Sequence, residues 1–177
     1  MKKTALVIVF ALAVFGCTRQ PNIGTGGEAV QQLKGPAPDF DLVNVAGGKL
    51  NSADIKGKIT IVDFWATWCA PCIQEIPNFN KIHAAHDGKG VQMLGVTVES
   101  GDLDDIKPKV AKLKMQYPVL VGDEKVVEGF GGLIGFPTTF IVTKGWKIYK
   151  RYLGMTPNKK ELIEKDIAKL LSAEAVE

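Results

Sequence analysis

This sequence is poor in arginine, histidine and cysteine, and these shortages exclude several classes of protein. Only two of its 22 basic residues are arginine, and the formal net charge is +3. Nucleic-acid-binding proteins concentrate basic charge, and arginine leads bidentate phosphate contacts, so we expect no nucleic-acid partner. Three cysteines in 177 residues are too few for a disulfide-stapled scaffold. A single hydrophobic core must therefore hold one domain, for which 46% hydrophobic residues suffice.

The sequence also lacks an apolar run of the roughly 20 residues that a membrane-spanning helix needs. Its longest run, residues 5–15, follows Lys2 and Lys3 and ends at Gly16. A basic start, a short apolar stretch and a small residue are typical of a secretory signal peptide. We therefore expect residues 1–16 to be a signal peptide and the mature protein to be extracytoplasmic, on the periplasmic side.

Residues 14–17, Val-Phe-Gly-Cys, resemble the lipobox of bacterial lipoproteins. The resemblance implies that Cys17 is lipidated and anchors the mature chain to the membrane. The alternative is ordinary cleavage near Gly16, which leaves Cys17 as a free thiol on a soluble periplasmic protein. Residues 17–35 are polar and contain glycine, so we expect a flexible tether there and a folded domain over residues 36–177.

Beyond residue 36 the pattern alternates between strands and helices. Apolar runs predict strands at 40–45, 59–64, 91–98, 117–121, 138–143 and 146–153. Helices are expected at 72–85 and 102–115, and from Thr156-Pro157 to about residue 172. This order indicates an α/β fold with a mixed sheet.

Cys69 and Cys72 form a Cys-x-x-Cys motif at the junction of a predicted strand and its helix. This spacing brings the two sulfurs close enough for a disulfide in a small loop. The first position faces unpaired N–H groups at the helix N-terminus, which stabilise a thiolate. We therefore expect Cys69 to be the nucleophile and Cys72 to be the resolving thiol.

The segment Phe64-Trp65-Ala66-Thr67-Trp68-Cys69-Ala70-Pro71-Cys72 resembles the active-site stretch of the thioredoxin superfamily. Three further stretches narrow the resemblance to the TlpA/ResA-like family: Pro38-Asp39-Phe40-Asp41-Leu42, Gly57-Lys58 and Tyr117-Pro118-Val119-Leu120. The similarity covers residues 36 to about 170. It implies a thioredoxin-like fold with an N-terminal strand extension, and the activity of a membrane-tethered, extracytoplasmic thiol–disulfide oxidoreductase.

The resemblance also implies a substrate-binding surface. Gly135-Phe136-Pro137-Thr138-Thr139-Phe140 resembles the superfamily's cis-proline loop, which places the backbone before the proline beside the dithiol. An extended substrate segment pairs with that backbone. We therefore expect Phe136 and Pro137 to bind substrate, with Trp68 shaping the surface around the thiols.

Two acids complete the expected catalytic group. Glu75 matches a glutamate that the TlpA/ResA-like family places near the dithiol, and Asp63 matches the buried aspartate of thioredoxins. One or both are expected to exchange a proton with Cys72. The alternatives are an ordinary acid in the first turns of a helix for Glu75 and a hydrogen-bonded core acid for Asp63.

Other functions fit the sequence less well. Copper-delivery proteins on a related fold use a wider cysteine spacing and a later histidine, and none follows His86. A peroxiredoxin needs Pro and Thr or Ser where Val62 and Ala66 stand. His83 and His86 lie three residues apart without a third ligand nearby, so we expect no metal. The redox group is then the Cys69–Cys72 pair itself, with no separate cofactor.

The proline between the cysteines and the family resemblance favour reduction of client disulfides, for example in cytochrome c maturation. The expected partners are disulfide-bearing client proteins and, because an exported reductant must be recharged, a transmembrane electron donor.

Overall fold

Strand β4 (Ile59–Trp65) is the centre of the molecule, and every one of its residues is buried. The computed structural model describes residues 29–174. In it β4 pairs in parallel with β5 (Val91–Thr97) and antiparallel with β7 (Thr138–Val142). The sheet has eight strands in the order β1-β8-β7-β4-β5-β6-β2-β3. The outer strands are β1 (Val30–Pro36), β2 (Asp41–Asn44), β3 (Lys49–Asn51), β6 (Val119–Val121) and β8 (Lys147–Leu153).

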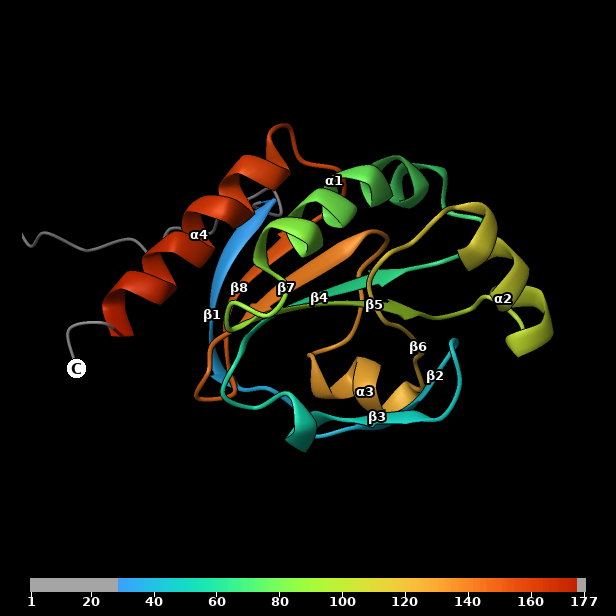
Figure 1. The fold of residues 1–177 in the computed structure, drawn as a ribbon, viewed down its shortest axis with the longest axis horizontal. Helices are drawn as coiled ribbons and strands as arrows, with labels where there is room; N and C mark the ends of the chain where they lie inside the picture. The colour runs from blue at the N-terminus through green and yellow to red at the C-terminus, as the bar shows by residue number, and fades with distance from the viewer. Residues whose placement is uncertain (1–28, 175–177) are drawn as a thin grey trace, which may run out of the picture.

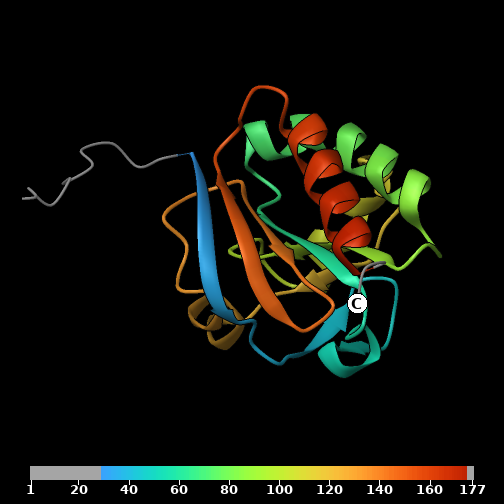
Figure 2. The same ribbon diagram turned by 90° about the vertical axis from the view of Figure 1, so that its left-hand side faces the viewer.

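Helices cover both faces of this sheet (Figure 1). They are α1 (Ala70–His86), α2 (Leu103–Lys112), α3 (Glu124–Gly129) and α4 (Lys159–Glu174), with one 3-10 turn, η1, at Ser52–Asp54. Figure 2 shows α1 and α4 side by side on one face, while α3 lies on the other in Figure 1. The expected α/β fold, a mixed sheet flanked by helices with an added N-terminal strand, is confirmed.

The alternation of side chains along β4 decides which of them lie under α1 and α4. Ile59 and Ile61 pack in a cluster with residues of both helices, namely Phe79, Ile82, Ile163 and Ile167. Val62 and Phe64 face the opposite way, in a second cluster that contains Val126 and Phe130. Because successive residues of a strand alternate between faces, Asp63 shares the face of Ile61 and lies under the two helices.

The folded domain begins earlier than expected. Residues 30–36 form β1, which pairs antiparallel with β8, and Leu33 packs against the core. The expectation of a flexible tether is therefore wrong for this stretch, because pairing with a sheet edge satisfies its backbone hydrogen bonds. The expected signal peptide at 1–16, Cys17 and the remainder of the expected tether lie outside the described residues.

The last helix begins later than expected. Asn158 has a φ of 58°, so α4 starts at Lys159 rather than at Thr156-Pro157. The sequence pattern also missed β3, η1 and α3, which are each six residues or shorter. Elements this short contain too few residues to show a period. Among the described residues, no helix is long and apolar enough to cross a membrane.

Candidate active site

The two cysteines of the motif lie where β4 gives way to α1. Cys69 is the N-cap of α1, and its sulfur accepts a hydrogen bond from the Cys72 backbone N–H at 3.3 Å. The pair forms a disulfide whose Cα atoms are 5.3 Å apart. A sulfur at this position faces the positive end of the helix dipole, which stabilises negative charge on it. The geometry therefore suits Cys69 as the thiolate that attacks.

An apolar surface adjoins the disulfide. The peptide bond between Phe136 and Pro137 is cis, as the resemblance implies. Phe136 packs against the cluster that contains both cysteines, and its ring lies edge-on to Trp68 at 5.7 Å between centroids. Trp68 is 61% exposed, and its Nε1 donates to the Glu99 carbonyl at 2.8 Å. The structure thus brings all three expected substrate-binding residues to the dithiol.

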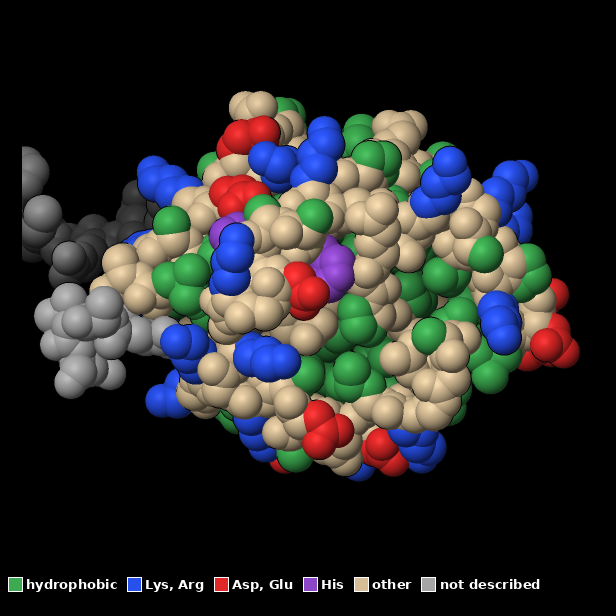
Figure 3. All heavy atoms as spheres, in the orientation of Figure 1, with side chains coloured by type: hydrophobic (Ala, Val, Ile, Leu, Met, Phe, Trp, Pro, Cys, Tyr) green, Lys and Arg blue, Asp and Glu red, His purple; other side chains and the backbone are tan. Residues whose placement is uncertain are grey.

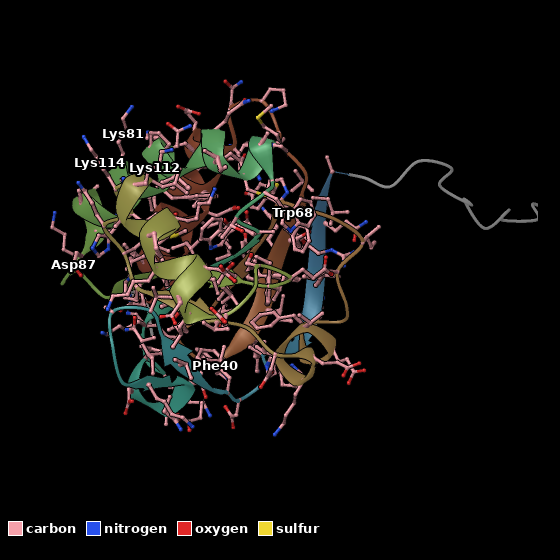
Figure 4. The ribbon with its side chains drawn as sticks, turned by 90° about the vertical axis from the view of Figure 1, so that its right-hand side faces the viewer. Phe40, Trp68, Lys81, Asp87, Lys112 and Lys114 are labelled. Atoms are coloured by element: carbon pink, nitrogen blue, oxygen red, sulfur yellow. A yellow bond between two sulfur atoms is a disulfide. The ribbon has the colours of Figure 1, made fainter. Side chains whose placement is uncertain are left out.

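Figure 4 shows where this surface lies relative to some of the basic side chains. Trp68 is well separated there from Lys81, Lys112 and Lys114. On the face shown in Figure 3, lysines and arginines are scattered among acidic and apolar side chains rather than gathered in one patch. The exposed Trp68 ring therefore does not form a cluster with these three lysines.

Asp63 is buried under α1, with an exposed fraction of 2%. Its neighbours across the sheet are Thr139 and Gly95, and the Thr139 hydroxyl donates to Asp63 Oδ1 at 2.7 Å. Burial raises the pKa of the Asp63 carboxyl to about 7, helped by the charge of Glu75 and opposed by Lys159 and Thr139. Because this pKa lies close to neutral pH, the Asp63 carboxyl can both accept and return a proton there.

Glu75 follows Cys72 by one helical turn and is also buried, at 6% exposed. Its Oε2 lies 2.8 Å from Nζ of Lys159, the first residue of α4. Burial raises the pKa of Glu75, while the hydrogen bond and charge of Lys159 lower it. The expected second acid is therefore next to the motif, but it is half of a buried ion pair.

Tyr117 approaches the acids from the segment before β6. Its side chain is 4% exposed, and burial together with the charges of Asp63 and Glu75 raises its pKa well above the ordinary value. Gly95 explains its position, because a Cβ there would come within 3.1 Å of the Tyr117 ring. The ring thus lies against the part of β5 that pairs with Asp63.

Lys159 and Tyr117 are the members of this cluster that sequence reasoning missed as site residues. A signal for Lys159 was present, since two consecutive lysines, 159 and 160, open a helix whose dipole disfavours cations there. Nothing in the sequence pointed to the hydroxyl of Tyr117. Trp65, in the segment just before the motif, is 1% exposed and fills the core.

The two histidines have other partners. His86 Nε2 lies 2.6 Å from Glu164 Oε2, and the His83 ring lies against Tyr117 at 6.4 Å between centroids. Within residues 29–174, no group of three or more His, Cys, Asp or Glu side chains is placed to hold a metal ion.

Known proteins resemble this chain in both sequence and fold. Residues 33–151 match the AhpC/TSA family. The thiol-disulfide oxidoreductase ResA of Geobacillus thermodenitrificans is 30% identical over 149 residues, which are 84% of each chain. ResA of Bacillus anthracis is 29% identical over 123 residues, or 70% of each chain.

A solved structure agrees with these relatives. The thiol:disulfide interchange protein of the thioredoxin family from Chlorobium tepidum superposes with a TM-score of 0.70 at 29% identity. The match covers 80% of this chain and 99% of that one. With a Cys-x-x-Cys disulfide at a helix N-terminus beside a cis-proline loop, the chain belongs to the AhpC/TSA family and is a thiol–disulfide oxidoreductase of the TlpA/ResA-like branch of the thioredoxin superfamily.

Proposed function

We propose that this protein reduces disulfides of client proteins outside the cytoplasm while tethered to a membrane by Cys17. One observation carries the proposal: the Cys-x-x-Cys pair lies at a helix N-terminus, directly after the strand that holds a buried carboxyl, Asp63, whose pKa burial raises to about 7. The helix supports a thiolate on Cys69, and the carboxyl accepts the proton of the second thiol at neutral pH.

The reaction starts from the reduced dithiol. The Cys69 thiolate attacks one sulfur of the client disulfide, so a Cys69–client bond forms and the client S–S bond breaks. The displaced client sulfur leaves as a thiolate and takes a proton from solvent. Cys72 then loses its proton to a buried carboxylate, and its sulfur attacks Cys69.

This second step forms the Cys69–Cys72 disulfide and breaks the Cys69–client bond. The second client sulfur leaves as a thiolate and is protonated in turn. The client has gained two electrons and two protons, and the protein has lost the same. Asp63 and Glu75 are the two candidates for the carboxylate that receives the Cys72 proton.

The client binds on the apolar side of the dithiol. The exposed ring of Trp68 offers an aromatic contact, and the backbone before the cis Pro137 is where an extended segment would pair. The client class is an exported protein that carries a disulfide, apocytochrome c among them, as the family resemblance implies. A transmembrane electron donor must then return two electrons to the Cys69–Cys72 disulfide.

The direction of exchange is tested by the reduction potential. The full chain is equilibrated with glutathione and dithiothreitol buffers, and the fraction of Cys69–Cys72 disulfide is counted by thiol alkylation and mass. A reductant should lie nearer to the thioredoxin value of about −270 mV than to the oxidant value of about −120 mV. A potential above about −180 mV, the value of protein disulfide isomerase, would instead indicate an oxidant or isomerase.

A further inference from the structure

Lys159 is a buried cation that no part of the cysteine motif explains. Its side chain is 4% exposed and pairs with a Glu75 side chain that is 8% exposed. A lysine at the start of a helix opposes the helix dipole, and a buried ammonium needs a charged partner. Glu75 meets that need, and the hydrogen bond and charge of Lys159 lower the pKa of Glu75 against the burial that raises it.

A cleft of about 420 Å³ leads from the surface to this ion pair. It lies between α1 and residues 155–161, and its lining includes Gln74, Glu75, Asn78, Lys159 and Lys160. Asp63 is not part of this lining. The ion pair therefore lies at the cleft, while Asp63 lies deeper, on the inner face of β4.

Four groups surround Asp63, three from helices and strands and one from the segment before β6. Thr139 of β7 donates a hydrogen bond to it. The charges of Lys159 in α4 and Glu75 in α1 shift the pKa of Asp63. The charge of Asp63 in turn raises the pKa of Tyr117, before β6. Lys159 lowers the pKa of Asp63 more strongly than Glu75 raises it. Tyr117 stays neutral because its own pKa is raised well above the ordinary value.

We infer that Lys159 is a positioning residue of the redox reaction, which keeps Glu75 ionised so that Asp63 is the group that takes the Cys72 proton. This inference rests on the proposed function for the existence of the proton transfer. An ionised Glu75 bonded to a lysine is a poor acceptor, because protonation would leave the buried ammonium without its partner. Asp63 accepts a hydrogen bond from the neutral Thr139 hydroxyl, and within residues 29–174 it forms no ion pair, so a change in its charge leaves no bonded cation without a partner.

In the resolving step, the Cys72 proton passes to the Asp63 carboxylate as the Cys72 sulfur attacks Cys69. The Cys69–Cys72 bond forms, the bond from Cys69 to the client sulfur breaks, and the client sulfur leaves as a thiolate. Asp63 then returns its proton to solvent, and Lys159 and Glu75 keep their charges throughout.

The experiment isolates this step with glutathione. The mixed disulfide between Cys69 and glutathione is formed in the full chain, and the rate at which Cys72 displaces glutathione is measured from pH 5 to about pH 9.5. The plot of this rate against pH should show a break for the wild type near the Asp63 pKa of about 7. Lys160→Met is the matched control, because Lys160 lines the same cleft but pairs with Glu161 rather than with Glu75.

The two halves of the ion pair should move this break in opposite directions. Lys159→Met removes the cation that lowers the Asp63 pKa, so the break should move up by about one pH unit. At pH values below the break, the variant should resolve the mixed disulfide roughly tenfold more slowly than the wild type. Glu75→Gln removes the anion that raises the Asp63 pKa, so the break should fall. Lys160→Met should leave the break unchanged. A purely structural role for Lys159 does not predict opposite shifts.

If Lys159→Met does not fold, the double variant Lys159→Met/Glu75→Gln removes both charges and leaves neither unpaired. Its break should still rise, because Lys159 outweighs Glu75 in its effect on Asp63. Loss of the break in Glu75→Gln would show that Glu75 carries the proton and would overturn the inference. So would a Lys159→Met profile identical to that of Lys160→Met. The proposed function fails separately, if the wild-type potential lies in the oxidant range.

Discussion

Replacement of Asp63 by asparagine should stabilise the fold at neutral pH and much less at acid pH. Burial raises the pKa of Asp63 in the folded state to about 7, against an ordinary value of 3.8. Because the folded pKa is raised, the folded state binds more protons than the unfolded state between these two values. The stability of the wild type therefore falls as the pH rises through this window.

The size of the effect follows from the shift. One pKa unit corresponds to 1.36 kcal/mol, so ionised Asp63 costs the folded state about 4 kcal/mol at pH 8. Asparagine has no charge to bury, and its Oδ1 still accepts the bond from Thr139. The variant should gain about 3–4 kcal/mol at pH 7–8 and less than about 1 kcal/mol at pH 4.

Urea unfolding of the oxidised protein, followed by circular dichroism from pH 4 to pH 8, measures this difference. Asp87→Asn is the control, since Asp87 is exposed at the C-terminal end of α1 and relief of its unfavourable contact with the helix dipole should give less than about 1 kcal/mol at any pH. A gain in Asp63→Asn that is constant across pH, or a loss at pH 8, would refute the argument that burial of charge on Asp63 dominates.

Three further predictions concern the dithiol, the anchor and the client surface. Cys72→Ser should accumulate mixed disulfides with clients on non-reducing gels, because the attacking Cys69 remains, whereas Cys69→Ser should trap almost none; equal trapping would reverse the assignment. Cys17→Ser should release the protein from membranes or stall precursor processing, and unchanged fractionation with unchanged mass would argue against lipidation. Trp68→Ala removes an exposed ring and its edge-on contact with Phe136, so KM for a protein client should rise roughly 2–10-fold while the rate with a small disulfide such as oxidised glutathione stays the same. An equal loss with both substrates would mean that Trp68 acts on the dithiol itself.

The sequence by itself determined the chemistry of this protein and most of its long elements. The spacing of Cys69 and Cys72 after a buried apolar run predicted a dithiol at a helix N-terminus, and the structure has it there. The cysteine spacing and the apolar periodicity are both local features, because a long strand or helix repeats its side-chain pattern within a few residues. The cis bond before Pro137 was also anticipated, though from the family resemblance rather than from the residues alone.

The edges of the fold were harder to predict. Residues 30–36 have no sustained apolar period, yet they form a strand because β8 offers an edge that satisfies their backbone. Thr156-Pro157 looked like the start of a helix, but the backbone conformation of Asn158 moves that start to Lys159. Contacts with neighbouring elements decide where such helices and strands begin, so local propensity does not predict these boundaries.

Only the tertiary structure decided the surroundings of the two acids. Glu75 and Lys159 are 84 residues apart in the chain, and they meet because α1 and α4 pack on the same face of the sheet. Tyr117 reaches the acids across the space left by Gly95 on a third element. The charge state of a buried carboxyl depends on desolvation and on every charge within a few ångströms. Sequence therefore identifies the candidate residues, whereas the packing of distant elements sets the charges that surround each buried carboxyl.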